Sequence, residues 1–458
     1  MRRPSFLLLL LLTAPAVCFG QQTAQQREAT ARSYLNSALT QADVEKAMSF
    51  AEKAILYDDE FAPAYYVRGQ LYEKKNETDK ALDDYRQALE LTYISRGKLE
   101  ADNNRLEEAI QEFSSAIDVF KKFAPRGGAA KGADVAYRAF YHRGLAHASL
   151  PQPDYDQAIR DLGEAIKMYP GFAPAYYNKG LVESLKGDLD AAIADSNDAI
   201  KMQPDYVEAY QSLGHFYEKK GRWAQAADIY RRALEIKQGD PDLIESLGNA
   251  LLEDGNAQAA LPRLRGAFEA KPNDPEVMSN YGWALFKSNQ RTDALRRLEA
   301  AREAVRDAGP ESDQLRSSIH ERLGRVYSEQ GNKVKAIDSY NAALRFRNDR
   351  RQEALINEGL GEAYSGLGEM ESAAAAYEAA AAALKALPDE SDKPLKVSVY
   401  VGLGDAYGAL KKTEPAKKSY DDALKLVDAK DSAQRDAITK KRDALGKAAF
   451  GRDRTTHD

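Results

Sequence analysis

The chain carries few of the side chains that could form a catalytic or metal centre. Its five histidines are His142, His147, His215, His320 and His457. A zinc-binding helix needs two histidines four residues apart, and no pair in this sequence has that spacing. We therefore interpret each histidine as part of a helix surface or a helix interface. We predict no catalytic site, no metal and no cofactor.

Two glycine-rich stretches have part of the composition of nucleotide-binding loops. In "GGAAKGA", residues 127–133, no lysine and hydroxyl pair follows Gly132, as it would in a phosphate-binding loop. "GLGEAYSGLG", residues 359–368, follows no predicted strand, which a dinucleotide-binding turn requires. We interpret the first stretch as a loop and the glycines of the second as part of a structural repeat.

The N-terminal residues have the order of a secretory signal peptide. Two arginines precede the apolar run 6–12, and small residues lead to Gly20, after which we expect cleavage. The apolar run is too short to span a bilayer as a permanent helix. We therefore expect an exported protein, periplasmic or extracellular. A lipid anchor at Cys18 is the alternative, although the preceding Val17 is larger than the residue normally found there.

Composition excludes several further function classes. Cys18 is the only cysteine, so cleavage after Gly20 would leave no disulfide, thiolate nucleophile or cysteine metal ligand. The formal net charge is −6, and losing the two N-terminal arginines makes it −8. Acidic and basic residues are interspersed, which disfavours a nucleic-acid or anionic-membrane surface. Even the arginine-rich stretch 291–306 contains acidic residues throughout, and we predict a solvated outer helix face there.

A repeat accounts for nearly the whole chain. Glycines recur at a constant interval at Gly180, Gly214, Gly248 and Gly282. Alanines follow each of them at two fixed distances, as Ala192 and Ala199 follow Gly180. The same skeleton gives ten units, and an eleventh near the N-terminus has Leu35 at the glycine position. The other unit glycines are Gly69, Gly97, Gly144, Gly324, Gly361 and Gly404. Such a fixed period is typical of stacked structural units.

Each unit has the pattern of two amphipathic helices joined by a tight turn. Apolar or small residues recur three and four positions apart on both sides of turn signals such as Gly187-Asp188 and Gly221-Arg222. The unit glycine lies inside the first helix, where it costs about 1 kcal/mol relative to alanine. We therefore predict that close packing of the second helix requires a glycine at this position.

These residues resemble the tetratricopeptide repeat. The fit includes Tyr210-Gln211-Ser212-Leu213-Gly214, followed by Tyr217, Ala226, Tyr230 and Ala233, and the resemblance extends over residues 33–428. It implies an all-α fold, a right-handed α-solenoid superhelix of about ten to eleven helix pairs. It also implies that the first helices line a concave groove, which in this family usually takes a peptide or a segment of a partner protein.

The spacing of the units predicts the organisation of the chain. The step from Gly69 to Gly97 is shorter than the regular step, which predicts irregular stacking, and the steps after Gly282 are longer, which predicts longer helices. We expect these segments: signal peptide 1–20, flexible segment 21–32, N-terminal units 33–120, flexible Gly/Ala/Lys loop 121–134, regular array 135–306, units with longer helices 307–428, and a capping helix with a disordered tail 429–458.

The resemblance also implies where a partner would bind. In the family the residues three before and one after each unit glycine point into the groove, and we call these the groove positions. The candidate partner-binding residues are Tyr66, Tyr141, Tyr177, Gln211, His215, Glu245, Asn249, Trp283 and Arg325. Aromatic side chains on an open concave surface are typical anchors for a bound segment. The alternative for the tyrosines is packing between helices.

One subfamily of these repeats binds the acidic tails of heat-shock chaperones through lysines, asparagines and an arginine. Asn249, Asn280 and Arg322 match that pattern, but Glu245 and Ser318 stand where lysines are needed. Glu245 would repel a carboxylate, and an exported chain would not meet cytosolic chaperones. We therefore exclude this function.

The resulting hypothesis is a non-catalytic protein–protein interaction scaffold of the cell envelope, without nucleic-acid binding or a membrane span. The first alternative is a recruiting or assembly subunit of an envelope export or enzyme complex. The second is an enzyme or a small-molecule-binding protein with its site in the groove. In a eukaryotic secretory pathway, "NET" at residues 76–78 would be a glycosylation acceptor.

Overall fold

The computed structural model describes residues 23–123, 133–346, 349–386 and 392–450 of the 458. Over these ranges it contains 22 α-helices and one short 3-10 helix, and no strand, which confirms the all-α prediction. The predicted signal peptide, Cys18, most of the loop 121–134 and the tail from 451 onward lie outside the described residues. No helix of the described ranges is long and apolar enough to cross a membrane.

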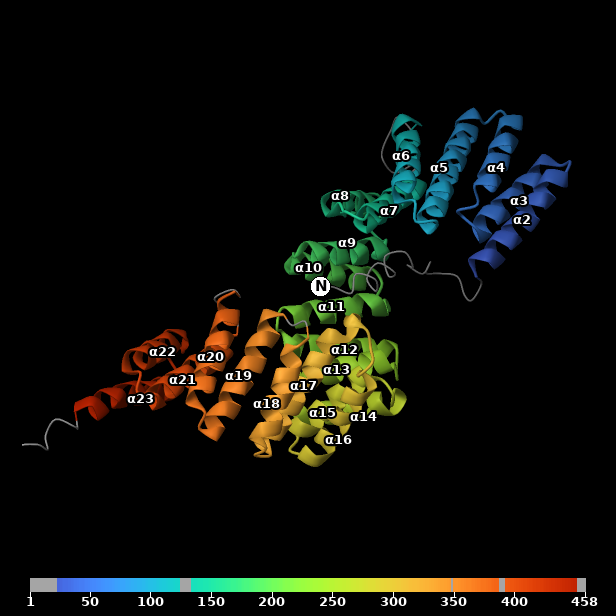
Figure 1. Cartoon of the computed structure of the whole chain (residues 1–458). Coiled ribbons are helices and arrows are strands. Elements are labelled where there is room, and N and C mark those ends of the chain that lie inside the picture. Colours follow the sequence, from blue (N-terminus) through green and yellow to red (C-terminus); the bar gives the residue numbers. More distant parts are fainter. Residues whose placement is uncertain (1–22, 124–132, 347–348, 387–391, 451–458) are drawn as a thin grey trace, which may run out of the picture. The chain divides into compact units, whose positions relative to one another are not determined.

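The chain divides into two compact units, which end and begin at Gln238 and Gly239. Within each unit, consecutive helices lie side by side in pairs (Figure 1). The helices of the first unit are α2 (Ala24–Thr40), α3 (Val44–Tyr57), α4 (Ala62–Lys74), α5 (Thr78–Asp102), α6 (Leu106–Phe123), α7 (Ala133–Ser149), α8 (Tyr155–Met168), α9 (Ala173–Lys186), α10 (Leu189–Met202), α11 (Val207–Lys219) and α12 (Trp223–Ile236). The boundary falls inside the predicted array 135–306, whose repeat period continues through it unchanged.

The second unit continues the same alternation of helices and ends in a single helix. Its elements are α13 (Pro241–Glu253), α14 (Ala257–Ala270), α15 (Pro275–Lys287), α16 (Arg291–Ala304), η1 (Pro310–Ser312), α17 (Asp313–Glu329), α18 (Lys333–Leu344), α19 (Arg350–Leu367), α20 (Met370–Lys385), α21 (Lys393–Ala409), α22 (Thr413–Leu426) and α23 (Ser432–Phe450). Counting α5 in two pairs, the described helices form eleven pairs and the terminal α23. This number confirms the ten to eleven units that the repeat predicts.

The unit glycines lie where the second helix of each pair comes closest to the first. A Cβ added at Gly214 would lie 2.5 Å from Cε1 of Tyr230, and one added at Gly97 would lie 2.6 Å from Cε1 of Phe113. At all ten unit glycines the nearest atom would be within 3.0 Å. A Cβ this close forces its neighbours to shift, so glycine is the residue that fits the observed packing. The packing prediction is confirmed.

The turns and the alanine pattern also agree with the prediction. Gly187, Gly221 and Gly255 have φ values of 101°, 66° and 84°, in the left-handed region where glycine carries no steric cost. The repeat alanines are buried, and Ala192 and Ala199 have no exposed surface. The buried repeat alanines therefore let neighbouring helices come close together.

The short step between Gly69 and Gly97 is explained by α5, a single helix of 25 residues. Its first half packs on α4 as a second helix, and its second half packs on α6 as a first helix. Because no turn separates the two halves of α5, the link that normally joins one repeat unit to the next is missing here. The predicted irregular stacking is therefore one helix, α5, that is shared by two consecutive helix pairs.

The N-terminal segment differs from the prediction. The sequence predicts a flexible segment at residues 21–32, but α2 begins at Ala24. A capping box starts this helix, because the amide of Gln26 donates to Thr23 Oγ1 at 3.3 Å and the amide of Thr23 donates to Gln26 Oε1 at 2.9 Å. Ala31 is fully buried, so tertiary packing stabilises a helix whose hydrophobic pattern is weak.

The C-terminal units agree with the expected lengthening of helices. Helices α17, α19 and α21 have 17, 18 and 17 residues, compared with 13 in α11, α13 and α15. The predicted cap is α23, which packs on α21 and α22 through the buried Ile438. Such a cap covers the apolar face that the last repeat would otherwise expose.

Candidate binding groove

Two of the three candidate tyrosines are buried between helices. Tyr141 and Tyr177 are each only 3 % exposed. Each ring is covered by the residue that directly precedes the first helix of the following pair. The ring centroid of Phe172 lies 5.0 Å from that of Tyr141, and the ring centroid of Tyr206 lies 5.1 Å from that of Tyr177. Burial raises the pKa of Tyr177 to about 12. Packing, the alternative interpretation, therefore describes both tyrosines in this structure.

Tyr66, the third candidate, is 52 % exposed. Its ring contacts Tyr85, with 5.5 Å between the centroids. In a regular unit a residue from the link to the next unit would cover this ring, but the continuous helix α5 replaces that link. The two "FAPAYY" copies of the sequence thus place their second tyrosine differently, because the units that follow them differ.

Ion pairs in the first unit engage Lys98 and Arg138. Lys98, at a groove position of α5, donates to Glu60 Oε2 at 2.6 Å. Arg138 of α7 pairs with Asp59 and lies 3.8 Å from Glu60 Oε1. Burial opposes ionisation of Glu60, but Lys98 and Arg138 together lower its pKa to about 2. Lys98 and Arg138 are therefore already paired with carboxylates of the first unit.

Gln211 and His215 remain accessible in α11. Gln211 is half-buried, and the His215 side chain is 53 % exposed with its Nδ1 3.3 Å from Glu218 Oε2. Together with Tyr66, these residues are the candidates of the first unit that a partner could contact without rearrangement.

In the second unit, polar groups connect three successive first helices. Asn280 of α15 donates through Nδ2 to Glu245 Oε1 of α13 at 3.0 Å, and its Oδ1 accepts from Arg322 Nη1 of α17 at 2.9 Å. Arg322 also donates to Ser279 Oγ at 2.7 Å. Burial raises the pKa of Glu245 to about 7, although the hydrogen bond from Asn280 opposes this. Two residues that match the chaperone-binding pattern, Asn280 and Arg322, are therefore engaged within the helix stack.

Trp283 is packed rather than open. Only 8 % of it is exposed, its ring stacks on Phe286 at 4.9 Å between centroids, and Lys287 Nζ lies 4.9 Å from its centroid. The guanidinium carbon of Arg322 lies 5.8 Å from the same ring. Trp283 thus serves as a platform for two cations, which stabilises their charge. A partner would meet Lys287 before it met the indole.

The remaining candidates of the second unit are half-buried. Asn249 lies on α13, and Arg325 of α17 pairs with Glu321 on its own helix and lies 3.7 Å from Glu358 on α19. Arg325 therefore joins two successive first helices, and part of its side chain still reaches solvent.

Sequence reasoning missed a recurring ion pair within the helix pairs of the first unit. In four of the six helix pairs, the residue before the unit glycine is a cation that meets a carboxylate on the second helix. The pairs are Arg68–Asp84, Arg96–Glu112, Arg143–Asp161 and Lys179–Asp195, at 2.6 to 2.8 Å. The carboxylate follows the unit glycine at one constant distance, except that Asp161 lies two positions later because the turn of its unit is longer. This spacing is visible in the sequence and could have been found there.

Two histidines of the described helices occupy packing positions, whereas His215 is exposed. His142 stacks on Phe113 with 5.6 Å between centroids, and burial lowers its pKa to about 3. His320 stacks on Phe346 at 5.8 Å, and burial lowers its pKa to about 4. Within the described ranges, no group of three His, Cys, Asp or Glu residues could hold a metal ion.

The glycines of "GLGEAYSGLG" have a packing role. A Cβ added at Gly359 would lie 2.4 Å from Cζ of Tyr340, and one at Gly361 would lie 2.7 Å from Cε1 of Tyr377. Gly402 contacts Tyr377 in the same way. Each of these tyrosines is thus inserted between the first helix of its own pair and that of the next pair. This geometry agrees with the interpretation of these glycines as part of the repeat.

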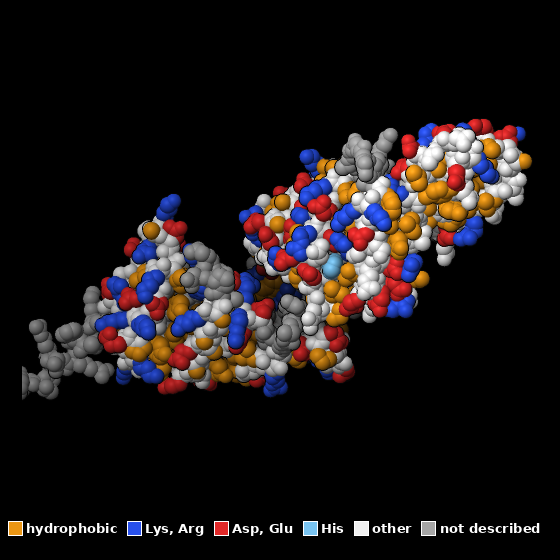
Figure 2. Space-filling model, turned by 90° about the horizontal axis from the view of Figure 1, so that it is seen from above, with side chains coloured by type: hydrophobic (Ala, Val, Ile, Leu, Met, Phe, Trp, Pro, Cys, Tyr) orange, Lys and Arg blue, Asp and Glu red, His pale blue; other side chains and the backbone are white. Residues whose placement is uncertain are grey.

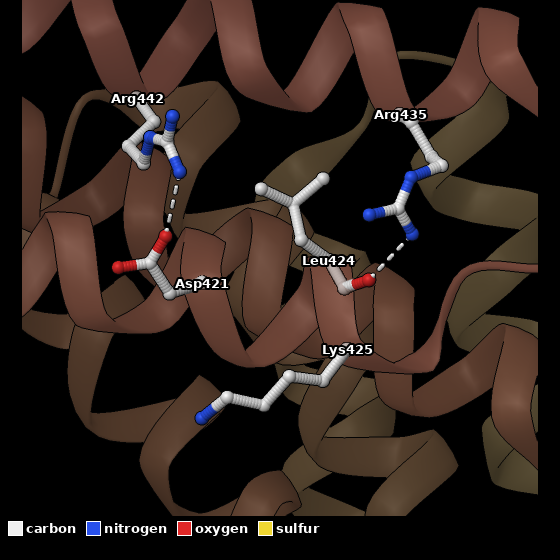
Figure 3. A pocket seen from close by; sticks show the side chains of 5 residues that line it. All are labelled: Asp421, Leu424, Lys425, Arg435 and Arg442. Atoms are coloured by element: carbon white, nitrogen blue, oxygen red, sulfur yellow. Dashed lines mark hydrogen bonds and ion pairs between the residues drawn. The ribbon is translucent and has the colours of Figure 1, made fainter. Parts of the chain in front are cut away.

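A shallow hollow lies between α22 and α23 (Figure 3). Arg442 Nη1 donates to Asp421 Oδ1 at 2.9 Å, and Arg435 Nη1 donates to the carbonyl of Leu424 at 2.9 Å. The polar groups of the hollow therefore hold the capping helix in place. On the face shown in Figure 2, basic and acidic side chains are intermingled, as the sequence predicts.

Comparison with known proteins agrees with this geometry. Family models described as tetratricopeptide repeat match residues 62–91, 144–200, 209–244, 251–319, 317–350 and 397–426, which together are more than half of the chain. The chain belongs to the tetratricopeptide repeat family. No curated protein sequence matches it significantly.

Several solved structures are similar to this chain. The match to YrrB, described as having an unusual peptide-binding site, has 24% identity and a TM-score of 0.33, and it covers 40% of this chain and 91% of that one. The match to MamA has 22% identity and a TM-score of 0.34, with the same coverage. A match from the Cut9–Hcn1 structure has 12% identity and a TM-score of 0.49, over 92% of this chain and 96% of the other. The family assignment rests on the sequence matches.

Proposed function

We propose that this protein is a non-catalytic scaffold of the cell envelope that binds an extended or helical segment of a partner protein through its groove positions. The observation that carries the proposal is the array of eleven helix pairs of a family whose first helices line a binding groove. Tyr66, His215 and Asn249 offer aromatic and polar contacts at these positions without rearrangement. A mostly preformed surface of this kind lowers the ordering cost of binding.

The test compares sets of alanine variants that keep the fold. One set changes Tyr66 and His215 in the first unit. Another changes Asn249 and Glu362 in the second, where Glu362 is the exposed groove position after Gly361. A matched control changes Arg231, an exposed residue of α12 outside the groove positions. Each full-length variant is used for affinity capture from the native envelope fraction, followed by mass spectrometry. Binding of the identified partner is then measured by titration calorimetry.

We expect at least one groove set to weaken binding more than tenfold, and the control to leave it unchanged. Truncating a hot-spot side chain near the centre of an interface costs about 2 kcal/mol or more, and about 1.4 kcal/mol corresponds to a tenfold change in affinity. Equal binding by all variants would contradict the proposal. If the captured partner belongs to an export or enzyme complex, the more specific role is that of its recruiting subunit.

The envelope location is a separate part of the proposal, because it depends on the predicted signal peptide. Mass spectrometry of the protein from its native cells should find an N-terminus at Gln21 in a periplasmic or extracellular fraction. A lipid-modified N-terminal Cys18 in the membrane fraction would identify the alternative anchor. An intact Met1 in the cytosol would contradict export.

A further inference from the structure

Three charged side chains meet where α9 packs on α10. Lys179 Nζ donates to Glu183 Oε1 at 2.8 Å and to Asp195 Oδ2 at 2.7 Å. Glu183 is only 6 % exposed, and its other oxygen, Oε2, is buried without a hydrogen-bond partner. One ammonium group therefore serves two carboxylates at a site with little access to water. Burying an excess negative charge in this way costs free energy unless a proton neutralises it.

The surrounding helices supply no second cation in contact with Glu183 among the described contacts. On the side of α8, Asp156 is bonded to Lys186. On the side of α11, Lys219 Nζ lies 3.4 Å from Ser184 Oγ. The titratable side chain of α7 that contacts α9 is Tyr141, which is bonded to Asn178. Lys179 and Asp195 are thus the charged groups that determine the ionisation of Glu183.

Glu183 departs from the commonest residue at its position in the repeat. Three positions after the unit glycine, the chain most often has tyrosine, as in Tyr72, Tyr217 and Tyr327. In the unit of Gly180 the same position holds a buried carboxylate. A tyrosine there would stay neutral at physiological pH, whereas a glutamate can gain or lose a proton.

We propose that Lys179, Glu183 and Asp195 form a proton-binding joint, which stabilises the packing of α9 on α10 in mildly acidic solution and weakens it as the pH rises. When Glu183 is protonated, the joint holds one ammonium and one carboxylate, and its net charge is zero. When Glu183 ionises, a second negative charge enters the site. The packing then loses free energy because Glu183 Oε2 has no donor.

The direction of the effect follows from linkage. Burial raises the pKa of Glu183 from 4.5 to about 7, Asp195 raises it as well, and Lys179 lowers it. The folded state therefore binds a proton that the unfolded state has released. An acid of this kind favours folding most below its unfolded pKa, and the advantage is lost as the pH rises through the folded value. The loss should occur between about pH 4.5 and 7 and then level off.

The test uses the full chain with Trp283→Phe, which leaves Trp223 of α12 as the only tryptophan and the reporter of the first unit. Thermal unfolding is followed by the fluorescence of Trp223 at pH values between 4.5 and 8.5. Glu183→Gln is nearly isosteric and removes the ionisation, and Glu235→Gln changes an exposed glutamate of α12 as the matched control. Asp195→Asn keeps the ability of Glu183 to ionise and removes the carboxylate that shares its cation.

We expect the Tm of Glu183→Gln to exceed that of the parent chain by an amount that grows from pH 4.5 to about pH 7 and then stays constant. In Asp195→Asn the pH dependence should shift to lower pH, because Lys179 then serves Glu183 alone. Glu235→Gln should follow the parent curve. The proposal is overturned if the Glu183→Gln and parent curves are parallel, or if Asp195→Asn leaves the pH dependence unchanged.

Discussion

Replacing one unit glycine with alanine tests the packing argument directly. In Gly214→Ala the new Cβ would lie 2.5 Å from Cε1 and 2.6 Å from Cζ of Tyr230. Gly163 in α8 provides a matched control in the same compact unit, the first, since a Cβ added there has nothing within 4 Å. Both substitutions replace a helical glycine, so both gain about 1 kcal/mol of helix propensity. The difference between the two variants therefore isolates the cost of the steric overlap.

Overpacking of this kind costs about 1 to 3 kcal/mol. Gly163→Ala should therefore stabilise the first unit by about 1 kcal/mol, while Gly214→Ala should be neutral or destabilise it by up to about 2 kcal/mol. For a unit of this size, 1 kcal/mol corresponds to about 2 to 4 °C in Tm. The two variants should thus differ by roughly 2 to 12 °C.

The assay is thermal and urea unfolding of the full chain carrying Trp283→Phe, with Trp223 fluorescence as the probe of the first unit. A second pair of variants, made in a Tyr230→Ala background, removes the ring that Gly214 accommodates. There the difference between Gly214→Ala and Gly163→Ala should shrink, because the overlapping atoms are absent. If Gly214→Ala is as stable as Gly163→Ala in the original background, close packing does not explain the unit glycines.

Three further substitutions have defined outcomes in urea unfolding. Ala226→Trp should lower the free energy of unfolding by about 1 to 3 kcal/mol or more, because Ala226 has no exposed surface, and unchanged stability would contradict the repeat register. Arg143→Met should cost on the order of 3 kcal/mol, since it leaves the buried carboxylate of Asp161 without its bidentate partner, and Asp161→Leu in the same chain should recover part of that loss. Gly359→Ala should be neutral or lower the stability of the second unit by up to about 2 kcal/mol, and a gain in stability would show that Tyr340 can move aside.

The sequence alone determined the repeat, the type of its helices and the role of its small residues. The constant spacing of glycine and alanine is visible in the sequence. It predicts the packing because each repeat unit makes the same helix–helix contacts at the same positions. The turn at Gly187 and the capping helix α23 followed from local chemistry. These features depend on neighbours within one or two units.

Only the tertiary structure decided which groove positions are accessible. Tyr66 and Tyr177 occupy equivalent places in nearly identical phrases, yet one is exposed and the other buried. The difference arises because Tyr206 covers Tyr177, whereas α5 continues without the link that would cover Tyr66. The burial of Ala31 in α2 and the unit boundary at Gln238 likewise depend on contacts between helices. Local patterns specify how each helix pair forms, but the exposure of a side chain depends on what the next pair places over it.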